Sequence, residues 1–190
     1  MQFLLTTTRT YSDAELFAML SGGGAESRQA LTTLYDRYSQ RIYTYCRKIT
    51  GSSTIAEDIL QETYTRFYES SKHIRGAENV VGYLFAIARN QCLNYKSKRR
   101  EELIMPEEIE LISHDRPYEQ QELLDILARA LDLLPDDYRE IFVLREYNGM
   151  SYNEIAETVG ISLDIVKIRI FRAKKKLREI LAPYLVDLDV

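Results

Sequence analysis

Residues 151–177, SYNEIAETVGISLDIVKIRIFRAKKKL, decide the fold, because they predict two short helices joined by a tight turn. Ser151 and Glu154 have the spacing of a capping box, in which a hydroxyl and a carboxylate satisfy free amides at a helix start. Gly160 can end the first helix because glycine tolerates positive φ. Ala156 is a small residue where two helices can cross closely, and Ser162 can cap the second helix. This pattern is typical of a helix-turn-helix.

The second of these helices divides into an apolar seam and a cationic remainder. Apolar residues recur at steps of four, three and four, at Val166, Ile170, Ala173 and Leu177. The other faces carry Lys167, Arg169, Arg172, Lys175 and Lys176. In a helix-turn-helix the start of the second helix enters the major groove, and flanking cations bind phosphates. The alternative is a pair of packed helices with a solvated cationic face.

Upstream of this stretch the sequence predicts two more helices. Leucines at helical spacing occupy positions 123, 124, 127, 131 and 134, and Pro135 can stop that helix and open the next. The next helix covers about 136–147 and ends at the Asn148-Gly149 turn signal. The last helix is expected to end near Pro183. We therefore predict a four-helix C-terminal domain over 123–182, followed by a tail of residues 183–190.

The N-terminal part also shows helical periodicity. Apolar residues at steps of three and four run from Gln29 to Ile49, and Gly51 ends the stripe. Thr54 and Glu57 have capping-box spacing, and the helix they open is expected to run to about Ser70. Ile55, Ile59, Thr63 and Phe67 share one side of it. A third long helix is expected over 80–100. These patterns predict a domain of three to four helices over 12–100, preceded by an extension of residues 1–11.

Charge separates the two parts. Residues 101–140 contain 13 acidic and 3 basic residues, whereas the net charge of the whole chain is −4. Residues 101–122 include Pro106 and Pro117 and have no sustained period, which indicates a linker. Strand alternation is not evident anywhere. The predicted fold class is all-α, with two small helical domains joined by a flexible acidic linker.

Composition excludes several classes of protein. Only 2 Cys and 2 His are present, which excludes a disulfide framework and a zinc finger, and no apolar run could span a bilayer. We expect a cytoplasmic protein without direct membrane insertion, since no secretory signal is recognisable. His73 and His114 stand alone, and Cys46 and Cys92 are interpreted as packing residues. Without a nucleophile–base pair, a phosphate-binding glycine loop or a ligand cluster, we expect no enzyme activity, no cofactor, no metal and no small-molecule substrate.

The predicted helix over 80–100 combines cations with aromatic rings. Arg89, Lys96 and Arg100 are seven and four residues apart and share a face, and Tyr83, Phe85 and Tyr95 lie on the same helix. Phosphates that pair with cations and bases that stack on rings would suit a single strand. The alternative is that the rings belong to the core. On the preceding helix Asp58, Gln61, Glu62 and Thr65 form a polar stripe, which is also what a solvated outer face looks like.

Three segments taken together resemble the sigma-70 family of bacterial transcription initiation factors. They are AEDILQETYTRFYES (56–70), YLFAIARNQCLNYKSKRR (83–100) and LPDDYREIFVLREYNGMSYNEIAETVGISLDIVKIRIFRAKKKLRE (134–179). The resemblance covers about 12–182. Because no large middle domain is present, the chain is most similar to the extracytoplasmic-function (ECF) branch.

The resemblance implies partners and site residues. The first domain is similar to region 2, whose contact with the β′ clamp helices of core RNA polymerase corresponds to Asp58, Ile59, Gln61 and Glu62. Contacts with the −10 promoter element correspond to Lys72, Arg75, Asn79, Arg89, Asn90, Lys96, Lys98, Arg99 and Arg100. The second domain is similar to region 4, which reads the −35 element and packs on the β flap. The reading residues would be Ser162, Asp164, Lys167, Ile168, Arg169, Arg172, Lys175 and Lys176. An anti-sigma factor is a further implied partner.

The sequence departs from the family pattern in two places. Val81-Gly82 stands where the family usually has a Trp. Asp164, Ile165 and Ile168 replace residues that are often Gly, Thr and Ser, so fewer base-edge hydrogen bonds and more contact with thymine methyls are expected. A dimeric helix-turn-helix repressor or activator remains the alternative, and pull-down of core polymerase would distinguish the two.

Overall fold

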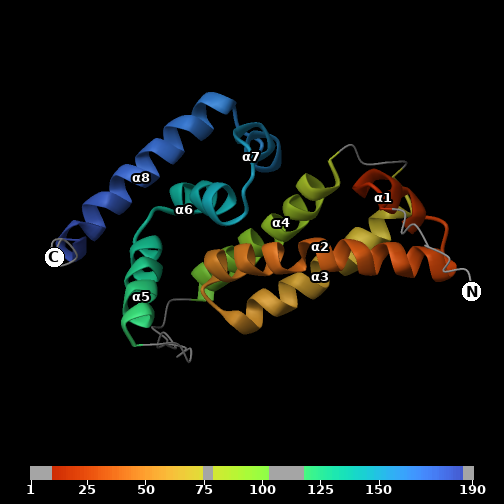
Figure 1. Cartoon of the computed structure of the whole chain (residues 1–190), viewed down its shortest axis with the longest axis horizontal. Coiled ribbons are helices and arrows are strands. Elements are labelled where there is room, and N and C mark those ends of the chain that lie inside the picture. Colours follow the sequence, from red (N-terminus) through yellow and green to blue (C-terminus); the bar gives the residue numbers. More distant parts are fainter. Residues whose placement is uncertain (1–9, 75–78, 103–117, 186–190) are drawn as a thin grey trace, which may run out of the picture.

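All the secondary structure in the described part of the chain is helical (Figure 1). The computed structural model describes residues 10–74, 79–102 and 118–185. The helices are α1 (Asp13–Leu20), α2 (Gly24–Thr50), α3 (Ser53–Ser71), α4 (Val80–Glu102), α5 (Tyr118–Asp132), α6 (Asp136–Phe142), the π-helical turn η1 (Val143–Tyr147), α7 (Tyr152–Val159) and α8 (Leu163–Leu185). The all-α prediction is confirmed. Within these residues no helix is both long and apolar enough to cross a membrane.

Helices α1–α4 form one packed group, in which α2 contacts α1, α3 and α4. Edge-to-face ring pairs fill its core: Phe17 lies 5.3 Å from Phe67, and Tyr45 lies 5.7 Å from Phe85, between ring centroids. The apolar side predicted for α3 is confirmed, because Ile59, Thr63 and Phe67 are all buried. Tyr35, included in the predicted stripe of α2, is instead 43% exposed, with its ring against Tyr64.

Two helix starts differ from the prediction. Helix α1 is the fourth helix that the prediction of three to four helices allowed, but no pattern located it; it begins after a capping box in which the Glu15 amide donates to Ser12 Oγ and the Ser12 amide donates to Glu15 Oε2 (2.8 Å). The capping box predicted at Thr54 is wrong. Ser52 is the N-cap of α3, because its backbone is extended and its Oγ accepts from the Ile55 amide (3.4 Å).

Helices α5–α8 form the second group. The helix expected over 136–147 is α6 followed by η1, so a π turn interrupts it. Helix α5 begins at Tyr118, inside the segment predicted as linker, because residues 118–122 contain no helix breaker. Helix α8 continues past Pro183 to Leu185. Most of the predicted linker, together with Arg75 and His114, lies outside the described residues.

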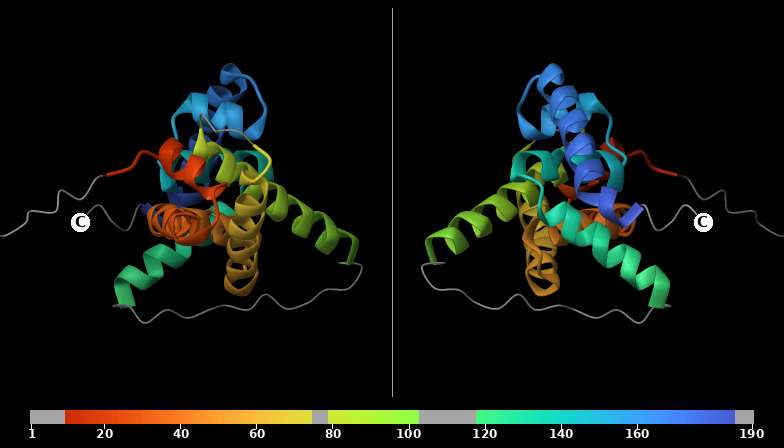
Figure 2. Two further views of the ribbon diagram at one scale, coloured as in Figure 1. Left: turned by 90° about the vertical axis from the view of Figure 1, so that its right-hand side faces the viewer. Right: turned by 90° about the vertical axis from the view of Figure 1, so that its left-hand side faces the viewer.

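The two groups of helices pack against each other. One continuous core contains Ile42 and Phe85 from the first group and Leu144, Met150 and Ile155 from the second, all at most 1% exposed. Helix α7 lies against α4, and η1 lies against α2. Figure 2 views the molecule from two opposite sides, and in both views the C-terminal helices α6 and α7 lie next to the N-terminal helices. The predicted acidic linker therefore joins two groups of helices that are in direct contact.

Candidate nucleic-acid interface

Helices α7 and α8 form a helix-turn-helix whose local geometry follows from a few polar contacts. The predicted Ser151–Glu154 capping box is present: the Glu154 amide donates to Ser151 Oγ (3.2 Å), and the Ser151 amide donates to Glu154 Oε2 (2.6 Å). These hydrogen bonds lower the pKa of the Glu154 carboxyl. Gly160 adopts φ 74°, and its amide and that of Ile161 both donate to the Ala156 carbonyl. The turn is therefore a glycine-dependent one, as predicted.

The apolar seam of α8 faces the core. Val166, Ile170, Ala173 and Leu177 are 0%, 3%, 0% and 8% exposed. Ser162 Oγ accepts from the Ile165 amide at 3.4 Å, in the position of an N-cap. Packing of this seam orients the remaining faces of α8 outward (Figure 1).

Most of the predicted −35 residues lie together on the outward faces of α8. Lys167, Ile168, Arg172, Lys175 and Lys176 are exposed. Asp164 is also exposed and forms an ion pair with Lys167, at 3.3 Å between Oδ1 and Nζ. Arg169 differs from the others, because its guanidinium pairs with Asp137 at 2.5 Å and its side chain is only 25% exposed. Arg169 therefore anchors α8 to the start of α6.

The cations of α4 are arranged differently, since acidic residues of the C-terminal helices engage them. Arg89 Nε donates to Glu140 Oε1 at 2.7 Å, and Arg89 Nη2 donates to Glu140 Oε2 at 3.3 Å. Lys96 forms an ion pair with Asp136. Arg89 and Lys96, which the resemblance assigned to the −10 element, thus contact the second group of helices.

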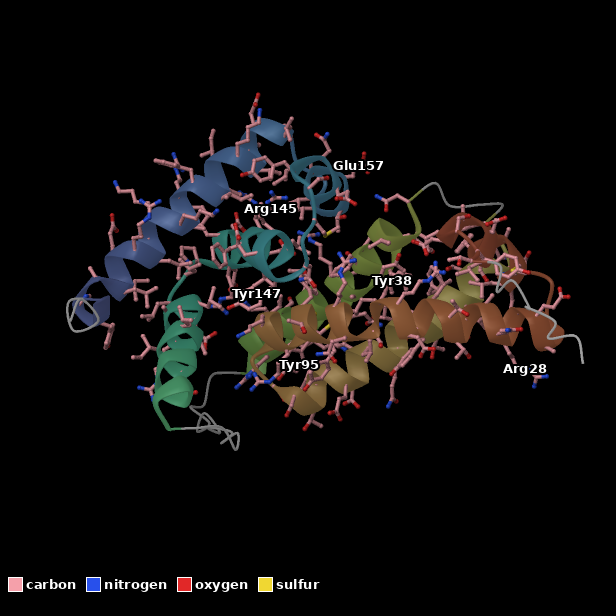
Figure 3. All side chains as sticks on the ribbon, in the orientation of Figure 1. Arg28, Tyr38, Tyr95, Arg145, Tyr147 and Glu157 are labelled. Carbon is pink, nitrogen blue, oxygen red and sulfur yellow. The ribbon has the colours of Figure 1, made fainter. Side chains whose placement is uncertain are left out.

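Three further contacts complete this interface. Asn79 Nδ2 donates to Glu157 Oε2 at 3.3 Å, which brings α7 to the beginning of α4 (Figure 3). Arg41 donates to the Asn148 carbonyl and stacks on Phe85, with Cζ 5.7 Å from the ring centroid. Lys48 Nζ lies 5.0 Å from the Tyr147 ring centroid. Burial at this contact, and then the neighbouring Arg47, lower the pKa of Lys48.

Glu140 is a buried charged residue of the interface, at 8% exposed. Besides Arg89 it accepts a hydrogen bond from the Tyr45 hydroxyl at 2.9 Å. Complete burial, followed by the Glu140 charge, raises the pKa of Tyr45 well above its ordinary value, so the phenol stays a neutral donor. A buried carboxylate with a guanidinium and a phenol has the partners that a buried charge requires.

The remaining −10 residues are spread over the surface of the N-terminal helices. Asn90 and Lys98 are exposed, and Arg99 Nη1 lies 3.5 Å from the Tyr95 hydroxyl. Lys72 Nζ lies 4.8 Å from the Tyr68 ring centroid, at the end of α3. Arg100 lies on the α4 backbone, but its side chain lies outside the described part of the chain, as does Arg75.

The aromatic rings of α4 pack on the core, which favours the core alternative over a stacking surface. Phe85 is fully buried against Tyr45. Tyr83 packs between Phe17 and Phe67, at 6.4 and 5.9 Å, and Tyr95 is partly buried against the core. Spacing alone could not distinguish a ring that faces solvent from one that faces the next helix.

The polar stripe of α3 is a surface feature. Asp58, Gln61 and Glu62 are exposed, and Glu62 pairs with Arg66 at 2.6 Å. Ile59, assigned to the same contact, is only 8% exposed and belongs to the core. A partner that docks on this stripe can touch the three polar residues directly, whereas Ile59 supports the helix from beneath.

Sequence reasoning missed two kinds of residue. Arg41 and Glu140 were not identified, because contacts between residues 51 to 107 positions apart leave no local pattern. Phe171 was not singled out, although it is 66% exposed on α8, and Ile165, for which contact with thymine methyls was expected, was left out of the list of reading residues, although it is 42% exposed. Their apolar character at positions off the seam of α8 was a signal that the sequence did carry.

The fold and the exposed cationic helix define a two-part all-α protein with a helix-turn-helix. Residues 34–102 match the family model "Sigma-70 region 2", and residues 124–177 match "Sigma-70, region 4". The chain is 30% identical to the ECF RNA polymerase sigma factor SigM of Bacillus subtilis over 151 residues, which cover 76% of this chain and 91% of SigM. The chain belongs to the sigma-70 family of transcription initiation factors, in its ECF branch.

Other similarities agree with this assignment. The ECF sigma factor SigE of Mycolicibacterium smegmatis is 31% identical over 159 residues, which cover 80% of this chain and 61% of SigE. Two solved structures share the fold at 24% identity. One is CnrH in complex with the cytosolic domain of CnrY, with a TM-score of 0.66 and coverage of 94% of this chain and 99% of that one. The other is the sigma factor RpoE in complex with the anti-sigma factor NepR from Bartonella quintana, with a TM-score of 0.68 and coverage of 80% and 96%.

Proposed function

We propose that this protein is a promoter-specificity subunit that binds core RNA polymerase and directs it to promoters with −10 and −35 elements. The observation that carries the proposal is a pair of cationic helices, α4 and α8, on separate groups of helices within a chain of the sigma-70 family. In this assignment, residues 12–100 bind polymerase and the −10 element, and residues 123–182 bind the −35 element. Polymerase performs the chemistry, and the subunit needs no cofactor.

The two promoter elements would be recognised by different chemistry. Exposed cations of α8 would bind phosphates while the start of the helix enters the major groove. The region from Lys72 to Asn79 would capture a flipped −10 base, at an unstacking cost of a few kcal/mol that pocket and phosphate contacts offset. Melting would then start from base capture and not from ATP hydrolysis.

Binding to the −10 element would compete with the contacts of this interface. Phosphates would have to compete with Glu140 for Arg89 and with Asp136 for Lys96. Core polymerase would separate the two groups of helices and hold them at promoter spacing, which raises affinity through effective concentration.

Two surfaces fit polymerase contacts. The exposed Asp58, Gln61 and Glu62 on α3 would dock on the β′ clamp helices. A mostly apolar pocket of about 430 Å³ between α5, the end of α6, η1 and α8, lined among others by Leu131, Phe142 and Leu177, would accept the β flap. An anti-sigma factor is a further proposed partner, in line with the complexes in which CnrH and RpoE were solved.

Run-off transcription with purified core polymerase on genomic fragments tests the proposal. We expect specific transcripts that need this protein, and pull-down of core polymerase. If the protein bound a palindromic operator as a dimer without retaining core polymerase, the repressor or activator alternative would replace the proposal.

Replacing Asp58 and Gln61 with Ala tests the polymerase contact. Because both side chains are exposed, folding should be unaffected, while core affinity falls at least about tenfold if each residue is an interface hot spot. The measurement is a binding titration with labelled core polymerase.

A matched control is the double variant Asp36→Ala with Gln40→Ala, two exposed residues of the same types on α2. It should bind core polymerase with normal affinity. Equal weakening by both double variants would show that the α3 stripe is not the contact.

A further inference from the structure

Helix α8 exposes apolar side chains on the face opposite its seam. Ile165, Ile168 and Phe171 are 42%, 49% and 66% exposed. At about 100° per residue, Ile168 lies on the opposite side of the helix from Val166 and Ile170, which are buried. Single exposed apolar residues are ordinary, but three on one half of one helix are a concentrated feature.

These residues form a patch with two charged neighbours. Residues three and four apart on a helix are adjacent, so Asp164, Ile165, Ile168, Phe171 and Arg172 make one continuous surface, called here the reading patch. It occupies the N-terminal half of the second helix of the helix-turn-helix, the part that contacts base edges in this motif.

The chemistry of the reading patch restricts what it can recognise. In the major groove the apolar group on offer is the thymine C5 methyl. The side chain of Asp164 is 85% exposed and would repel phosphate, so this end of the helix suits base edges better than the DNA backbone. Arg172 is exposed one turn beyond Ile168, where a phosphate contact is possible.

We propose that Ile165 and Ile168 read thymine methyl groups in the upstream promoter element. The inference rests on the proposed function and adds the base chemistry of the site. Ile165 and Ile168 are three residues apart, which corresponds to about 4.5 Å along the helix axis. Because base pairs are about 3.4 Å apart, the two thymines should lie in neighbouring base pairs or be separated by one intervening base pair.

A protein partner is the competing occupant of an exposed apolar patch. The reading patch is less suited to one, because exposed charges of Asp164, Lys167 and Arg172 surround its isoleucines. The hollow apolar surface of this part of the chain is elsewhere, in the pocket between α5, η1 and α8.

The test has two stages and uses the full chain with core polymerase. First, promoter templates with a randomised upstream element are selected for run-off transcription. Second, deoxyuridine replaces thymidine at single positions of a selected element, which removes one methyl and nothing else. We expect binding to weaken about fourfold at one or two positions, as the loss of one buried methyl predicts.

Variants connect the effect to the reading patch. Ile168→Ala should lose the difference between thymidine and deoxyuridine at one of these positions and keep it at the position that Ile165 reads, and Ile168→Val should restore the lost difference. Arg172→Ala should weaken binding to both templates alike and reduce the salt slope by about one. Leu133→Ala, an equally apolar and 65% exposed position outside α8, should behave as wild type.

Several results would overturn the inference. Equal binding of thymidine and deoxyuridine templates by the wild type would do so, as would an Ile168→Ala variant that discriminates at every position as the wild type does. Loss of core polymerase binding in Ile168→Ala would assign the patch to a protein contact instead. Failure to select any template would reject the proposed function itself, and the inference with it.

Discussion

At the scale of the residue, Gly160 forms the turn between α7 and α8. Its φ of 74° lies in the left-handed region, and nothing lies within 4 Å of where a Cβ would stand. A Cβ at this position would destabilise the fold because the left-handed backbone conformation is unfavourable for residues other than glycine, and not because it would clash with neighbouring atoms.

Replacing Gly160 with Ala should therefore destabilise the protein by roughly 1–2 kcal/mol, measured by urea unfolding. The control is Gly22→Ala, where φ is not positive and an added Cβ would meet the Met19 carbonyl oxygen at an ordinary 3.6 Å. That variant should change stability by less than about 0.5 kcal/mol. Equal losses in the two variants would contradict the role of positive φ.

At the scale of the element, the helices are defined by caps as much as by apolar faces. At the start of α1, α3 and α7, a serine hydroxyl accepts a hydrogen bond from a backbone amide; these serines are Ser12, Ser52 and Ser151. The cap of α7 also holds Glu154 in hydrogen bonds that lower the pKa of its carboxyl. Helix α7 has only eight residues, so its start depends strongly on these contacts.

Ser151→Ala should cost about 1 kcal/mol of stability at neutral pH, the usual loss for an N-cap hydroxyl. Urea unfolding of this variant beside wild type gives the measurement. An unchanged midpoint would mean that packing against α4 alone holds α7 in place.

Glu154→Gln should show a pH-dependent loss. Because the folded pKa lies below the unfolded one, the carboxylate stabilises the fold above the unfolded pKa, and this stabilisation disappears as pH falls through the folded pKa. The stability difference between wild type and variant should shrink over that acidic range. The exposed Glu69→Gln serves as the control and should show no matching trend.

At the scale of the whole molecule, the C-terminal helices cover cations of α4 while leaving the outward face of α8 exposed. Glu140 and Asp136 hold Arg89 and Lys96, and the two groups of helices share one core. The free protein should consequently bind an upstream duplex more readily than a −10 single strand.

The double variant Glu140→Gln with Asp136→Asn should loosen this contact, since it removes two negative charges from the interface without changing side-chain size. A lost hydrogen bond between the buried Glu140 and Arg89 is worth about 1.5–3 kcal/mol, whereas the more exposed Lys96–Asp136 pair is worth only about 0–1 kcal/mol. We expect a larger radius of gyration in small-angle scattering and tighter binding of free protein to the −10 strand. Asp137→Asn, which breaks the Arg169 pair inside the C-terminal group, is the control and should leave both readouts unchanged.

Local signals predicted much of this protein. The seam of α8, the turn at Gly160, the capping box of α7 and the apolar side of α3 are all encoded within a few residues, so periodicity and cap chemistry identify them. The N-cap of α3, Ser52, was misplaced by two residues, because Ser52, Ser53 and Thr54 are successive hydroxyl residues that can each cap a helix. The π turn η1 interrupts a periodic stretch without any marker in the sequence.

The sequence by itself determined the helical class, the family and the cationic face of α8, because each depends on short-range spacing. Only the tertiary structure decided which cations are free to meet DNA. Arg89 and Glu140 are 51 positions apart in the sequence and yet form an ion pair. Phe85 is buried in the core, so its ring is not exposed for bases to stack on. Such pairings depend on how helices pack in three dimensions, where one side chain's burial is set by residues far away in the chain.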